Sequence, residues 1–96
     1  MKVVYTRHAA DDLENIFNFI ADRSNRNIAK SVIARIVRAV ERQLPLFPES
    51  GRLGVVPDTY ELVVSSLPYI VVYGLSDTEI IIHGVFHGAQ DRHDKD

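Results

Sequence analysis

The chain contains no cysteine in its 96 residues, which excludes disulfide bridges and thiolate metal sites. Nothing in the composition therefore argues for an oxidising compartment. The first apolar run ends at Tyr5 and is too short for the apolar core of a signal peptide. No apolar stretch approaches the ~18 residues that a bilayer crossing needs. We expect a cytoplasmic protein that does not act at a membrane.

A large excess of positive charge is also missing. The net charge is −2 at pH 7, which argues against a protein whose main role is to coat phosphate backbones. With 46% hydrophobic and 25% charged residues, the composition is that of one small globular domain, so we expect residues 1–96 to form a single domain. A domain this short buries only about 60 to 65% of its unfolded surface. A bound partner could therefore add considerably to its stability.

Recognisable catalytic motifs are absent as well. There is no glycine-rich phosphate loop, and Ser65 and Ser66 lack the flanking glycines of a nucleophile elbow. His83 and His87 are four residues apart in a predicted strand, where they would share a face but lie too far apart for one metal ion. We expect no metal or cofactor, with His83 a sheet residue and His87 a hydrogen-bonded residue at the strand end. A general acid or base role for His87 is the alternative.

The N-terminal half has the pattern of a strand followed by two helices. A β-type run ends at Tyr5, and Thr6 is a favoured N-cap residue. Apolar residues then recur at three- and four-residue spacing, which predicts an amphipathic helix from Arg7 to a point between Asp22 and Asn25. After a polar turn at 24–27, a second such pattern predicts a longer helix that ends before Pro45. The short link implies an antiparallel helical hairpin whose apolar faces pack on a sheet.

A basic stripe lies on the second predicted helix. Arg35, Arg38 and Arg42 fall on one side, opposite the centre of the apolar stripe, and should face outward. No glutamate stands four residues before any of them, so the helix itself does not neutralise them. The stripe is either a solvated helix face or a docking surface for an acidic partner.

The C-terminal half predicts a three-stranded antiparallel meander over residues 60–64, 67–73 and 79–86, all rich in β-branched and aromatic residues. Tyr69 and Tyr73 should pack in its core. A long loop with prolines and glycines at 45–57 precedes it and carries Arg52, which we expect to be solvated or paired with Glu49 or Asp58. The predicted fold class is α+β, in the order β-α-α-β-β-β, with the helices packed on the sheet.

This order resembles the ParE/RelE family of bacterial toxins along about 90 residues. The resemblance rests on the joint order and spacing of several short motifs: Tyr5-Thr6, Ala9-x-x-Asp12-Leu13-x-x-Ile16, Gly51-Arg52, Glu61-Leu62-Val63, Pro68-Tyr69-Ile70-Val71-Val72-Tyr73 and His87-Gly88.

The resemblance implies the toxic half of a type II toxin–antitoxin pair, forming a hetero-oligomer with its antitoxin. That partner would be a ParD-like, ribbon-helix-helix DNA-binding protein that lays an extended and helical segment over the toxin. ParE-like members poison DNA gyrase through an interaction surface, whereas RelE-like members are ribosome-dependent endonucleases of messenger RNA.

Two departures favour the ParE-like function, which requires no enzyme activity. Many relatives have an arginine before the Glu-Leu pair and basic residues after His-Gly, whereas this chain has Tyr60 and then Ala89-Gln90 at those positions. A ribonuclease could use only Arg52, His87 and Arg92. A non-toxic binding module is a further alternative. The candidate residues for binding the antitoxin or the target are Arg35, Arg38, Arg42, Arg52 and Tyr60.

Overall fold

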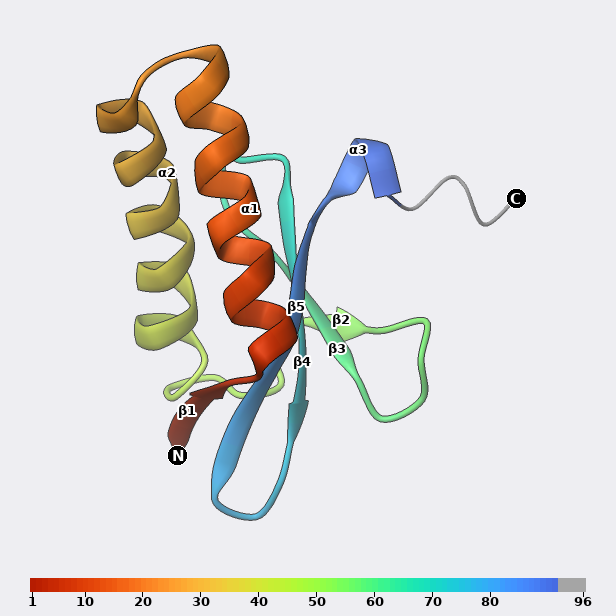
Figure 1. Ribbon diagram of the computed structural model, residues 1–96. Coiled ribbons are helices and arrows are strands. Elements are labelled where there is room, and N and C mark those ends of the chain that lie inside the picture. Colours follow the sequence, from red (N-terminus) through yellow and green to blue (C-terminus); the bar gives the residue numbers. More distant parts are fainter. Residues whose placement is uncertain (92–96) are drawn as a thin grey trace.

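A five-stranded sheet with two long helices on one face makes up the fold (Figure 1). The structure, a computed structural model, describes residues 1–91. The elements follow one another as β1 (Lys2–Tyr5), α1 (Arg7–Arg23), α2 (Arg26–Arg38), η1 (Ala39–Gln43), β2 (Arg52–Leu53), β3 (Tyr60–Val63), β4 (Tyr69–Leu75), β5 (Glu79–His87) and α3 (Gly88–Asp91). The predicted α+β class, the helical hairpin and the three-stranded meander are confirmed.

Both long helices begin at the residues that the sequence marks. The Thr6 side chain accepts a hydrogen bond from the backbone N–H of Ala9, and the Asn25 side chain accepts one from that of Ile28. Each bond satisfies a backbone donor in the first turn that has no partner within the helix. The second helix continues into η1, a π-helical segment that ends before Pro45 as predicted.

The sheet has the order β1-β5-β4-β3-β2, which the sequence did not indicate. Strand β1 pairs in parallel with the first half of β5, from Glu79 to Ile82, so the first strand of the chain lies beside the last one. Strand β2 is a two-residue addition within the predicted loop, and it pairs only with Tyr60 and Glu61 of β3. Strands β4 and β5 hold central places in the sheet, and the consecutive residues Tyr69, Ile70 and Val71 of β4 are buried, in agreement with their nearly continuous apolar sequence.

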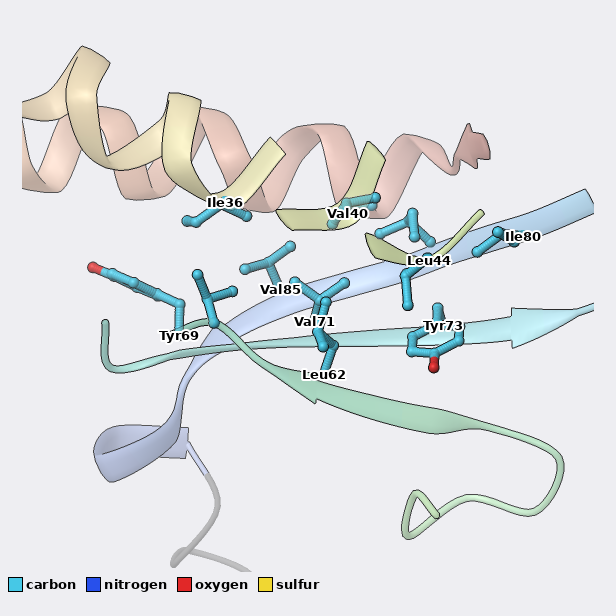
Figure 2. Packing of buried hydrophobic residues seen from close by; sticks show 12 residues of the cluster. Ile36, Val40, Leu44, Leu62, Tyr69, Val71, Tyr73, Ile80 and Val85 are labelled. Atoms are coloured by element: carbon cyan, nitrogen blue, oxygen red, sulfur yellow. The ribbon is translucent and has the colours of Figure 1, made fainter. Parts of the chain in front are cut away.

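The core lies between the sheet and the two helices, where side chains of α2 and η1 meet those of the strands (Figure 2). Tyr69 and Tyr73 belong to it, as predicted, and are 6% and 0% exposed. The residues of this cluster with almost no exposed surface are Ala9, Ile36, Val40, Leu44, Val71, Tyr73, Ile80 and Ile82. The helical hairpin is therefore fixed against the strands that form the C-terminal half of the chain.

A β-bulge in β5 changes the predicted placement of the histidines. The register with β4 shifts between Val72 and Tyr73, because Val72 pairs with Gly84 while Tyr73 pairs with Ile82. His83 is the extra residue, and it lies beside Gly74 on the face away from the helices. His87, past the bulge, lies on the helix face with its ring against Tyr69. The prediction that both share one face is wrong, because the bulge reverses the alternation.

The end of β5 is also more structured than expected. The backbone N–H of Ala89 donates to Nδ1 of His87 at 3.2 Å, at the start of α3. His87 is thus hydrogen-bonded at the strand end, as predicted. Among residues 1–91, no helix combines the length and apolar character that a bilayer crossing requires, and no three His, Asp or Glu side chains are placed to share a metal ion.

Candidate functional site: an arginine groove beside the open sheet edge

The three arginines of the predicted stripe line one groove of about 470 Å³. We call it the arginine groove; its lining residues are Arg35, Arg38, Ala39, Arg42, Gln43, Phe47, Val64 and Ser65. All three arginines are exposed, as predicted, and the groove that they line also includes Val64 and Ser65 after β3. Arg35 donates a hydrogen bond from Nη2 to the backbone oxygen of Ser65 at 3.2 Å, which anchors the helix to the β3–β4 turn.

The groove is positively charged because it has no carboxylate of its own. Among the described residues, the ion pairs within 4 Å join Arg7 to Asp11, His8 to Asp12 and Arg52 to Glu61, and none involves a groove arginine. Three guanidinium groups thus remain available to an anion.

Glu41 could have neutralised the groove, since it is the single acid between residues 23 and 42. Its carboxylate instead accepts a hydrogen bond from the Tyr5 hydroxyl at 3.1 Å. Burial of the phenol, together with this bond and the nearby carboxylate charge, raises the pKa of Tyr5 far above its usual value near 10. The phenol therefore stays protonated and keeps Glu41 bound to β1. Glu41 is thus hydrogen-bonded to β1 and does not line the groove.

The π-helical segment supplies part of the groove wall. Ala39, Arg42 and Gln43 belong to η1 and line the groove together with residues of α2. A π-turn widens the helix locally and changes the direction of the side chains that follow it, and such turns are frequent at functional sites. The sequence pattern gave no sign of this turn.

Apolar groups and an open backbone edge complete the groove. Phe47 is 62% exposed in the loop after η1 and lines the groove together with the arginines. Beyond Glu61, none of the described strands pairs with β3 on the side of β2, and Val63 on this edge is 53% exposed. Phe47, Val64 and Ser65 were not predicted to belong to a site. An aromatic residue between Pro45 and Pro48, in a loop, was the only available signal.

Arg52 and Tyr60 lie outside the groove. Arg52 contacts Glu61 through Nη2 at 3.1 Å and Nε at 3.2 Å, so the expected pairing with Glu49 or Asp58 is wrong. Cross-strand pairing of Arg52 with Glu61 places the two side chains together. Glu61 is only 5% exposed, and this ion pair offsets the cost of burying its charge. Tyr60 stacks on Tyr73 with ring centroids 5.4 Å apart and supports the core.

Of the residues that a ribonuclease could use, Arg52 and His87 lie on opposite faces of the sheet. Arg52 lies with Glu61 on the face of the sheet away from the helices, because the neighbouring Leu62 points into the core. His87 lies on the helix face, with its ring edge-on to Tyr69 at 5.4 Å. Arg92 falls outside the described residues. Burial raises the pKa of Tyr69, which makes this phenol a poorer proton acceptor near neutral pH.

Two solved structures share this arrangement of strands and helices and establish the class of fold. E. coli RelE aligns over 98% of this chain and 90% of its own, with a TM-score of 0.54 at 14% identity. The solution structure of the conserved Helicobacter pylori protein HP0894 aligns over 93% of this chain and 96% of its own, with a TM-score of 0.56 at 15% identity. The chain therefore shares the α+β fold of these two proteins.

The sequence comparisons identify the family to which the chain belongs within this fold. Residues 3–92 match the family described as the ParE toxin of the type II toxin–antitoxin system parDE, and the chain belongs to that family. A structure of the chromosomal ParDE system of P. aeruginosa aligns over 91% of this chain and 95% of its own, with a TM-score of 0.82 at 25% identity. "Putative toxin Y4kP" of Sinorhizobium fredii is 37% identical over 90 residues, which are 93% of this chain and 90% of that protein.

Proposed function

We propose that this protein arrests growth by binding and poisoning DNA gyrase, and that a cognate ParD-like antitoxin neutralises it in a hetero-oligomeric complex. The antitoxin occupies the arginine groove. The single observation that carries this proposal is the groove itself, in which three unneutralised arginines border apolar surface and an open strand edge.

The chemistry of the groove specifies its occupant. Unpaired guanidinium groups favour carboxylates, which they bind with two parallel hydrogen bonds. Phe47 and Val64 favour apolar side chains, and the free edge at Val63 favours an extended backbone. An acidic segment with alternating apolar residues meets all three requirements. A nucleic acid would use the charges but would leave the apolar surface without a partner.

The test of the groove is a charge reversal at Arg35, Arg38 and Arg42 to glutamate. We expect the Kd for the antitoxin encoded beside this gene to rise on the order of 1,000-fold, since close charge pairs across interfaces contribute roughly 1.5 kcal/mol or more each, or about 4.5 kcal/mol for three. The matched control reverses three cations outside the groove on the same hairpin, namely Arg23, Arg26 and Lys30. Equal affinity of the groove variant and the control would remove the groove from the proposal.

The choice of gyrase rests on the poor fit to ribonuclease chemistry. RNA cleavage needs cations around the scissile phosphate and a group that transfers a proton. Within residues 1–91, Arg52 is neutralised by Glu61, and His87 lies on the other face of the sheet. The three unpaired groove arginines face an interaction surface that holds no general base. A surface that traps a partner suits this arrangement better than an active site.

The target is tested by what accumulates after induction without antitoxin. We expect cleaved chromosomal DNA and an SOS response while messenger RNA stays intact. Codon-phased cleavage of messenger RNA would instead assign the RelE-like ribosome-dependent activity. Continued growth at a verified level of folded protein would mean that the chain is a non-toxic binding module.

A further inference from the structure

The hairpin that joins β2 to β3 has an apolar tip that residues 1–91 leave exposed. Leu53, Val55 and Val56 are 81%, 73% and 62% exposed. Single exposed apolar side chains are common, but three within four residues form a patch of the kind that marks interaction sites. We call these three residues the hairpin tip. They contribute nothing to the core that would explain apolar residues here.

The hairpin tip is held in a defined conformation. The backbone N–H of Gly54 donates to the oxygen of Thr59 at 2.8 Å, and both the backbone N–H and the hydroxyl of Thr59 donate to the oxygen of Val56, at 3.2 and 2.6 Å. Asp58 adopts a left-handed conformation with φ of 66°, which aspartate tolerates better than most residues. A preformed loop loses little conformational entropy on binding, which favours a role in recognition.

The base of the hairpin is fixed as well. The Arg52–Glu61 ion pair ties β2 to β3. The Tyr73 hydroxyl accepts a hydrogen bond from the N–H of Gly51 at 3.0 Å and donates one to the oxygen of Pro48 at 2.8 Å. A side chain at Gly51 would meet this hydroxyl and the backbone oxygen of Glu61, both 2.8 Å from a Cβ. The close approach therefore requires glycine.

The hairpin tip and the arginine groove are separate surfaces. In Figure 1 the hairpin projects away from both long helices, whereas the groove lies along α2 and the β3–β4 turn. An antitoxin segment in the groove would not need to touch the tip.

The charges around the tip indicate its partner. The only ionisable residue from 53 to 58 is Asp58, and the guanidinium group of Arg52 at the base is bound to Glu61. Phospholipid headgroups and nucleic acids attract unpaired cations, which the tip lacks. A convex apolar loop that carries one carboxylate fits an apolar pocket of a protein with a basic residue at its rim.

We propose that the hairpin tip inserts into such a pocket of the toxin's cellular target, on a surface distinct from the one that binds the antitoxin. This inference rests on the proposed function, because it assigns the tip to the target. It predicts that toxicity and antitoxin binding can be lost independently of each other.

The test replaces Leu53, Val55 and Val56 with serine. We expect growth arrest to be lost, and the affinity for purified gyrase, or for purified ribosomes if the wild type binds those, to fall at least 10-fold. The Kd for the antitoxin should stay within twofold, which also shows that the variant is folded. The control is Ile28→Ser on α2, where Ile28 is 46% exposed and lies outside the groove.

Other results would overturn the inference. Full toxicity and target affinity of the triple variant would show that the tip is not used. A loss of antitoxin binding would assign the tip to the antitoxin interface. Tip-dependent binding to phosphatidylglycerol vesicles, or tip-dependent self-association in sedimentation velocity, would assign it to a membrane or to a second copy. A wild type that does not arrest growth would contradict the proposed function itself, whatever the variant does.

Discussion

Replacing Tyr73 with phenylalanine tests how the loop before β2 is held in place. The ring is fully buried and would remain in the core, stacked on Tyr60. Only the hydroxyl is lost, and with it the hydrogen bonds to the oxygen of Pro48 and the N–H of Gly51. The substitution therefore separates the anchoring of the loop from the packing of the core.

The magnitude follows from the two groups left without a partner. A buried donor or acceptor that loses its partner costs about 1–3 kcal/mol, and partial access of water to this loop places the pair near the lower end. We expect a loss of about 2 kcal/mol in the free energy of unfolding, out of a total of about 5–10 kcal/mol for a domain of this size. The melting temperature should fall by about 8–16 °C.

The assay is urea denaturation followed by circular dichroism, with amide hydrogen exchange at Gly51 as a local readout. Exchange at Gly51 should accelerate, because its N–H loses an acceptor. The matched control is Tyr69→Phe, the same chemical change at another buried tyrosine, whose hydroxyl makes no hydrogen bond to a described residue. Ordinary surface substitutions change the free energy of unfolding by less than about 0.5 kcal/mol. A loss this small for Tyr73→Phe, equal to the loss for the control, would refute the anchoring role.

Two further predictions concern ionisable groups. Arg52→Ala should lower the free energy of unfolding, measured by chemical denaturation, by about 1–2 kcal/mol, since it removes the cation beside the buried Glu61 carboxylate. The control Arg7→Ala, in a largely exposed ion pair, should lower it by less than about 0.5 kcal/mol. Equal losses would contradict the importance of burial. Stability should also depend on Tyr5 at high pH. Because its folded pKa lies above the ordinary value near 10, the unfolded chain releases this proton first, so the contribution is complete below pH 10 and is lost as the pH rises above it. Between pH 9 and 11 the free energy of unfolding, measured by denaturation at each pH, should fall more steeply for the wild type than for Tyr5→Phe, by up to about 1.4 kcal/mol per pH unit. Parallel pH dependences would contradict the raised pKa.

Local sequence signals were sufficient for the helices and for the three long strands. Thr6 and Asn25 bond to backbone N–H groups within the next three residues, and apolar spacing depends only on the geometry of the helix itself. The cluster of Arg35, Arg38 and Arg42 could be predicted for the same reason, since a helix brings residues three, four and seven apart to one side. These features need no knowledge of the rest of the fold.

The partners of these elements could not be predicted, because they depend on residues far apart in the chain. Arg52 was expected to pair with acids close in sequence, yet the strand register places it opposite Glu61. The bulge at His83 depends on how β5 aligns with β4 and with β1, and it separated two histidines that strict alternation would have placed together. Neither outcome is encoded within a single segment.

The amino-acid sequence by itself determined the class of fold, the family resemblance and the presence of a basic helix side, since these follow from periodicity and motif order. Only the tertiary structure decided that this side forms a groove with Phe47 and Ser65, that Tyr5 is hydrogen-bonded to Glu41, and that the hairpin tip is exposed. The physical reason is that burial and ion pairing are set by contacts across the sheet, which become defined only when β1, α2 and the loops reach their places around β4 and β5.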